Sequence, residues 1–192
     1  MSNAGTWLFR GLVIAATGLI LLSWFMPWWR ADITMLNNWV QIRPYGLEMD
    51  PFTAGYFPSA KMPGYFAPFI WAYFGIIMAL VLFSLFVKER IISLGKLKIS
   101  LPKLIFGGVG LSFIFVAILA VIVAAIRTGD YYGMHLLGRQ MVEVDPELGA
   151  ESLVIPRFLF GYYMAYVAGL FCIVLALLRD RITGKNKVKV DK

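Results

Sequence analysis

Four long apolar segments set the strongest constraint on how this chain folds. They cover residues 8–29, 65–87, 104–127 and 158–179, with charged side chains only near their ends. Each is long enough for a helix to cross a hydrocarbon core about 30 Å thick. Hydrophobic residues make up 60% of the 192 residues and charged residues only 15%, which is too apolar for a soluble domain. We therefore predict an all-α membrane protein, a four-transmembrane-helix bundle that forms a single domain over residues 1–192.

The distribution of Lys and Arg predicts how the bundle is oriented. The link at 88–103 and the tail at 180–192 are strongly basic, whereas the loops at 30–64 and 128–157, counted with Arg127, hold six basic and eight acidic residues. The positive-inside rule then places both termini and the basic link in the cytoplasm, and the other two loops outside the plasma membrane. Topology and attraction to anionic lipid headgroups account for the net charge of +7 without a nucleic-acid partner.

The two outer loops carry β-strand patterns. Residues 33–36 and 39–42 are β-prone and flank Asn37-Asn38, a pair suited to a hairpin turn. Residues 140–144 alternate polar and apolar side chains, and residues 152–155 form a further β-prone run. Because a lone hairpin is marginally stable in water, we predict that both loops join one small extracytoplasmic β-sheet over the ends of the helices.

Aromatic side chains gather on the outer side of the predicted bundle. Three interpretations stay open: an interfacial aromatic belt, a contact surface for a partner subunit, or a groove for a lipid or quinone. As partner-binding candidates we select Trp28, Trp29, Trp39, Tyr45, Tyr131 and Tyr132.

Small residues at four-residue spacing indicate close helix packing. The clearest stripe is Gly161, Ala165 and Gly169 in the last helix, and Gly75 with Ala79 forms a shorter one in the second. We expect some of these stripes to pack inside the bundle and one to contact a neighbouring protein.

The run Pro27-Trp28-Trp29-Arg30, followed by Trp39 and Gly46-Leu47, resembles the claudin and PMP22-like four-helix membrane proteins. That resemblance implies four helices, cytoplasmic termini and a long first outer loop that carries a β-sheet. Glu48 stands where that family has a second Trp, and both of its loop cysteines are missing here. We take the resemblance as a fold analogy alone.

The sequence offers few groups for catalysis or cofactor binding. His135 is the single histidine, Cys172 is the single cysteine, and the apolar runs contain no carboxylate. We therefore expect no enzyme activity, no cofactor and no metal of the chain's own. Met134, His135 and Met141 could contribute to a copper site shared with another chain, although a solvent-facing or partner-facing histidine is the simpler interpretation.

By elimination, we predict a non-catalytic structural or accessory subunit of a larger membrane complex, such as a membrane oxidoreductase or monooxygenase. Other membrane protein subunits and membrane lipids are then the expected partners. One alternative is a lipid- or quinone-binding membrane protein, and another is a claudin-like self-assembling cell-contact protein.

Overall fold

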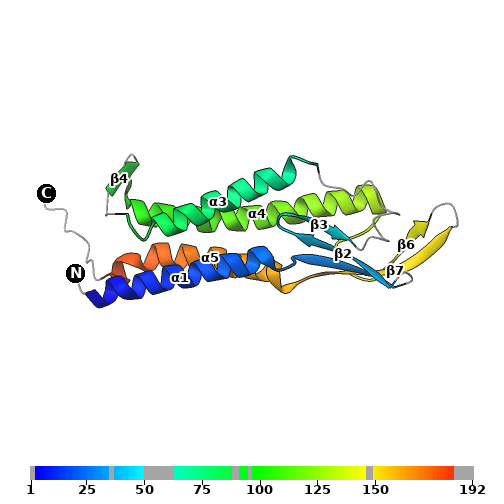
Figure 1. Cartoon of the computed structure of the whole chain (residues 1–192), viewed down its shortest axis with the longest axis horizontal. Helices are drawn as coiled ribbons and strands as arrows, with labels where there is room; N and C mark the ends of the chain where they lie inside the picture. The colour runs from blue at the N-terminus through cyan, green and yellow to red at the C-terminus, as the bar shows by residue number, and fades with distance from the viewer. Residues whose placement is uncertain are drawn as a thin grey trace.

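The computed structural model describes residues 3–34, 37–49, 63–87, 91–94, 97–145 and 149–183. Within these residues there are four helices long and apolar enough to cross a membrane: α1 (Asn3–Phe25), α3 (Phe66–Phe83), α4 (Leu101–Tyr132) and α5 (Phe160–Ile182). They lie side by side along the long axis of the molecule, with a β-sheet at one end (Figure 1). The four predicted helices are thus confirmed, although their ends shift.

Two of these shifts have clear local causes. The first helix ends at Phe25 rather than at residue 29, and after Pro27, which has no N–H to donate, the Trp28 amide pairs with the carbonyl of Ile42. The third helix runs on to Tyr132 rather than 127, where Gly133 ends it in the left-handed conformation with φ of 59°. Helix α4, with 32 residues, is therefore about 48 Å long. Helix α3 has 18 residues and is only about 27 Å long.

The sheet joins the two loops, as the sequence predicted. Its antiparallel order is β3-β2-β1-β7-β6, and the central pair joins β1 (Trp29–Ile33) to β7 (Ala150–Phe158). The other strands are β2 (Asn38–Arg43), β3 (Gly46–Met49) and β6 (Gln140–Asp145). Asn37 has the positive φ, 49°, that the hairpin turn requires, whereas Asn38 already belongs to β2. The sequence did not predict β3, nor the separate hairpin of β4 (Ile91–Leu94) and β5 (Leu97–Ser100).

The small-residue stripe of α5 packs inside the bundle. A Cβ atom on Gly169 would lie 2.9 Å from the carbonyl oxygen of Gly110 in α4, and one on Gly161 would lie 2.6 Å from that of Pro27. Ala165, between them, is fully buried. The α3 stripe behaves differently, because a Cβ on Gly75 would meet no atom within 4 Å and Ala79 is exposed.

Opposite faces of the sheet have opposite characters. One face carries Trp29, Ala31, Ile33, Val40 and Val154, which are all buried and form a second apolar core with Met134 and Val142. The other face carries ion pairs: Asp32 accepts from Arg30 at 2.6 Å and from Arg157 at 2.9 Å. Strand alternation therefore turns an apolar surface toward the end of α4 and a charged surface away from it.

Candidate functional site: an apolar cavity between the sheet and helix α4

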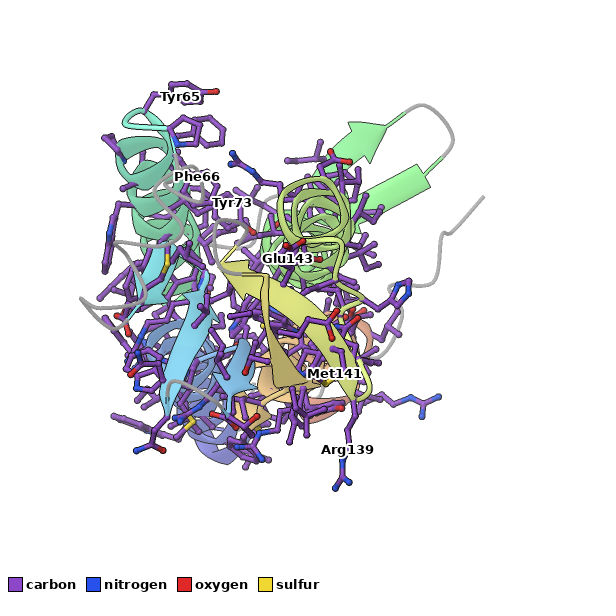
Figure 2. The ribbon with its side chains drawn as sticks, turned by 90° about the vertical axis from the view of Figure 1, so that its right-hand side faces the viewer. Tyr65, Phe66, Tyr73, Arg139, Met141 and Glu143 are labelled. Carbon is purple, nitrogen blue, oxygen red and sulfur yellow. The ribbon has the colours of Figure 1, made fainter. Side chains whose placement is uncertain are left out.

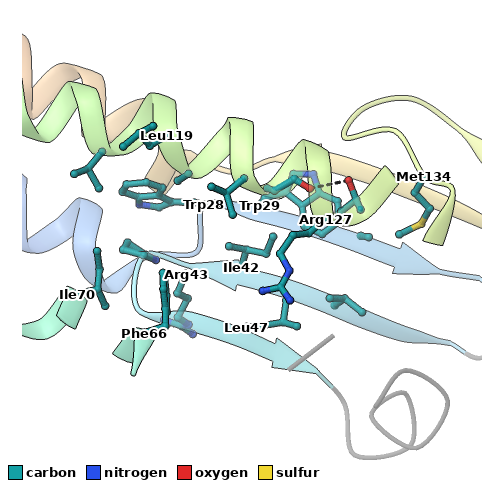
Figure 3. Close-up of a pocket in the computed structure, with 18 of the residues that line it drawn as sticks. Trp28, Trp29, Ile42, Arg43, Leu47, Phe66, Ile70, Leu119, Arg127 and Met134 are labelled. Carbon is teal, nitrogen blue, oxygen red and sulfur yellow. Dashed lines mark hydrogen bonds between the residues drawn. The ribbon is translucent and has the colours of Figure 1, made fainter. Parts of the chain in front are cut away.

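A cavity of about 340 Å³ lies where the apolar face of the sheet meets α3 and α4. Its walls come from the beginning of α3, the second half of α4 and the five strands of the sheet. Figure 3 shows this region in close-up. The lining is almost entirely hydrocarbon, with Trp28, Trp29, Ile42 and Leu47 on the sheet side. Ligand sites in proteins commonly fall in the range of roughly 300 to 1,000 Å³, so the volume suits a small ligand or one lipid chain.

Helices α3 and α4 form the closed end of the cavity. The Tyr73 hydroxyl lies 3.3 Å from the Ser112 hydroxyl and joins the two helices. One turn nearer the sheet, Ile70 and Val116 already line the cavity. Figure 1 shows α3 diverging from α4 toward the sheet end, and the cavity begins where the helices separate.

Along α4 the cavity is lined from Val116 to Thr128, a length of about 18 Å. Val116, Leu119, Ala120 and Val123 supply the apolar part of this wall. The Thr128 hydroxyl donates to the carbonyl of Ala124 at 2.9 Å, which satisfies it within its own helix. The wall is therefore apolar over most of its length and becomes polar only near the end of α4.

Two arginines line the cavity in different settings. Nε of Arg43 lies 2.8 Å from a carboxylate oxygen of Glu48, and its Nη1 donates to the carbonyl of Phe25. Burial alone would lower the pKa of Arg43, but hydrogen bonding to Glu48 and the charge of Glu48 outweigh it, so the pKa is raised. Arg127 extends from α4 across the cavity toward Leu47 of β3 (Figure 3). No acidic side chain is among the described residues that line the cavity.

Of the aromatic residues chosen as partner contacts, two belong to the interior. Trp28 and Trp29 are each 3% exposed, and their indole N–H groups donate to the carbonyls of Ser23 and Leu136. Both line the cavity rather than the outer surface, and a role for either in partner binding stays a prediction.

The other partner candidates lie elsewhere. Trp39 is on the charged face of the sheet, with the Arg30 guanidinium 5.3 Å from its ring centre. Tyr45 stacks on Trp71 of α3 at 5.3 Å. The side chains of Tyr131 and Tyr132 lie outside the described part of the molecule.

The three residues considered for a shared copper site are not brought together. Met134 is buried in the apolar core beside Val142, and His135 is exposed. Met141 is 60% exposed and precedes Val142 on β6, so it points to the opposite face of the sheet. It is labelled at the sheet end in Figure 2. A metal ion could not bind both methionines in this arrangement.

Sequence reasoning missed the two arginines of the cavity. A signal for Arg127 was present, because it is the first charged residue after 23 uncharged ones that follow Lys103. Arg43 gave no such signal, since its role depends on the turn that brings Glu48 and the end of α1 to it. Comparison of the chain with family models, with curated proteins and with solved structures finds no match.

Proposed function

We propose that this protein is an integral membrane protein that binds one hydrocarbon chain of a membrane lipid in the cavity between the sheet and α4. The observation that carries this proposal is the cavity itself, about 340 Å³ in volume and walled by apolar side chains from α3, α4 and the sheet. A partly open apolar space of this size in a membrane protein is a suitable environment for a hydrocarbon chain.

The charged residues of α4 support a cavity at the depth of lipid chains. Lys103 and Arg127 bracket the apolar run of this helix and are separated by about 36 Å along it. That distance falls between a hydrocarbon core of about 30 Å and a whole bilayer of about 40–45 Å. With both residues at headgroup level, the wall from Val116 to Ala124 would lie in one leaflet. By the positive-inside rule this is the extracytoplasmic leaflet.

The dimensions of the cavity also fit one chain. Its wall along α4 is about 18 Å long, and the chains of one leaflet fill about 15 Å, half of the hydrocarbon core. Phe69, Leu119 and Val123 line the cavity and are also 72%, 40% and 46% exposed, respectively. These residues would face surrounding lipid, so a chain could enter sideways between α3 and α4 without crossing water.

Neighbouring alanines of α4 provide a matched test. Ala124 lines the cavity, whereas Ala125 is exposed and does not. We expect the wild-type protein, purified in mild detergent, to retain about one lipid per chain by native mass spectrometry. Ala124→Phe should lower this occupancy about tenfold, because the ring takes up space that the chain needs, and Ala125→Phe should leave it unchanged.

The control for this test is the fold of each variant. Both proteins should unfold at temperatures close to that of the wild type, which would separate loss of lipid from loss of structure. A wild-type protein that carries no lipid, or equal retention by both variants, would contradict the proposal. The eluted molecule also shows whether the occupant is a glycerolipid or a quinone.

The accessory-subunit interpretation is our second candidate. Its support is β6, which forms one edge of the described sheet and exposes Met141 beside Glu143. Sheet edges with free backbone groups are sites where another chain can pair. The same purified sample bears on this candidate, because unlike subunits in fixed ratio would appear as additional masses.

A further inference from the structure

We infer that the cavity prefers lipids with an anionic headgroup and that Arg127 binds the phosphate of that headgroup. This inference rests on the proposed function, and it adds the class of lipid and the residue that selects it. The first support is the charge of the lining, which contains two arginines and no acidic residue among the described positions. A negatively charged group at the polar end of the cavity would thus find guanidinium groups, and no carboxylate, among the described lining residues.

Arg43 has a structural setting at one side of the cavity. Glu48 at 2.8 Å and the carbonyl of Phe25 hold its guanidinium in place. Arg43 is the last residue of β2, and its hydrogen bond to Phe25 joins the β2–β3 turn to the end of α1. We therefore assign Arg43 a structural role and do not expect it to select the headgroup.

Arg127 is placed at the polar end of the apolar wall. It lies about 16 Å along α4 from Val116, which is close to the length of a leaflet's chains. Its side chain reaches over the cavity toward Leu47 rather than along the outside of α4 (Figure 3). A chain that fills the apolar part would thus bring its headgroup phosphate to the Arg127 guanidinium, whose planar donors suit phosphate oxygens.

Headgroup choice can be measured with two lipids that have identical chains. We would reconstitute the protein in nanodiscs of phosphatidylcholine with a minor share of phosphatidylglycerol, and then compare the lipids it retains by native mass spectrometry. We expect phosphatidylglycerol to be enriched about tenfold over its share in the disc, because both lipids offer a phosphate to Arg127 but the choline cation of phosphatidylcholine is repelled by the guanidinium.

Charge variants separate the cavity from the general attraction of a basic protein. Arg127→Gln should abolish the enrichment, and Arg127→Lys should keep part of it because the charge remains without the planar fork. Arg139→Gln removes the same charge from an exposed position at the sheet end, away from the cavity (Figure 2), and should keep the full enrichment.

The outcomes distinguish this inference from the function on which it rests. If Arg127→Gln still enriches phosphatidylglycerol, or if Arg139→Gln loses the enrichment equally, the inference is overturned while lipid binding stands. If wild type and variants retain both lipids at their share in the disc, the headgroup preference alone is refuted. If the wild-type protein retains no lipid of either kind, the proposed function is refuted as well.

Discussion

Helix α4 has two very different neighbours. On one side it packs against α5 so closely that Gly110 and Gly169 meet backbone to backbone, and a Cβ on Gly110 would lie 2.5 Å from the Gly169 carbonyl oxygen. On the other side it meets α3 through larger side chains, a hydrogen bond from Tyr73 to Ser112, and then the cavity. One helix thus forms a close junction on one side and a loose one on the other.

This difference shows what holds membrane helices together, because burial of apolar surface contributes little to helix association inside a bilayer. In a bilayer the lipid chains are as apolar as the side chains, so close van der Waals packing and interhelical hydrogen bonds decide which helices pair. Helices α4 and α5 have small residues where they meet, whereas α3 presents Phe66, Phe69 and Ile70 near the sheet end. Bulky residues at a diverging junction leave space, and we propose that a lipid chain fills it.

The largest effect is expected from Gly110→Ala, which attacks the tight junction directly. The new methyl group would overlap the Gly169 carbonyl oxygen and the Ile173 side chain, at 2.5 and 2.8 Å. Separating the helices to admit it should lower the free energy of unfolding by about 3 kcal/mol. Denaturation in mixed detergent micelles, followed by circular dichroism, measures this.

Gly108→Ala is the matched control on the same helix. Gly108 is exposed, and a Cβ added there would meet no atom within 4 Å, so the methyl group of the alanine meets no obstacle. Alanine favours the helix by up to about 1 kcal/mol over glycine, and the control should be neutral or slightly stabilising. Equal destabilisation by both substitutions would mean that helix propensity rather than close packing explains the result.

A smaller effect is expected where α1 meets α5. The buried Ser23 hydroxyl donates to the Gly161 carbonyl at 2.9 Å, at the level where a Cβ on Gly161 would meet Pro27. Ser23→Ala leaves that carbonyl without its side-chain donor and should lower the free energy of unfolding by about 1 kcal/mol. The same micelle titration tests this, and no measurable change would show that the contact is not important for the junction.

The smallest effect on stability is expected where α3 meets α4. Tyr73→Phe removes the 3.3 Å contact with Ser112 but keeps the ring, and hydrogen bonds between membrane helices contribute about 0.6 kcal/mol on average. We expect a loss of about that size. If Tyr73→Phe instead costs more than Ser23→Ala, α3 is held to the bundle more firmly than the geometry indicates, and the contrast between the two sides of α4 fails.

Much of the fold could be predicted from local patterns. The four apolar segments predicted the helices, and the runs at 39–42, 140–144 and 152–155 predicted strands that form, because side-chain period and turn chemistry act over short distances. The run at 33–36 was placed too late, since β1 ends at Ile33 and residues 35–36 lie outside the described part of the chain. The ends of α1 and α4 were less accurate, since Trp28 joins the sheet by bonding to Ile42 and α4 continues to Gly133 beyond its apolar run. The strand at Gly46 was missed because it is only four residues long and pairs with β2 alone.

The site was harder to predict than the fold. The outer aromatic residues were considered for both a partner surface and a lipid groove, and nothing local distinguished the two interpretations. Trp28 and Trp29 are consecutive, yet both are buried, because the bend between α1 and β1 turns one toward the helices and the other toward the face of the sheet. Burial of this kind depends on segments more than a hundred residues apart, as the bond from Trp29 to Leu136 illustrates.

The sequence by itself determined four apolar helices, two strand-forming loops and a basic charge bias at one end, because each is a property of composition and period along the chain. The tertiary structure decided which small residues touch, how Arg43 pairs with Glu48, and where α3 leaves α4 to open a cavity. These features depend on distances between elements that are remote in sequence. Such distances follow from how side-chain volumes fit together in three dimensions.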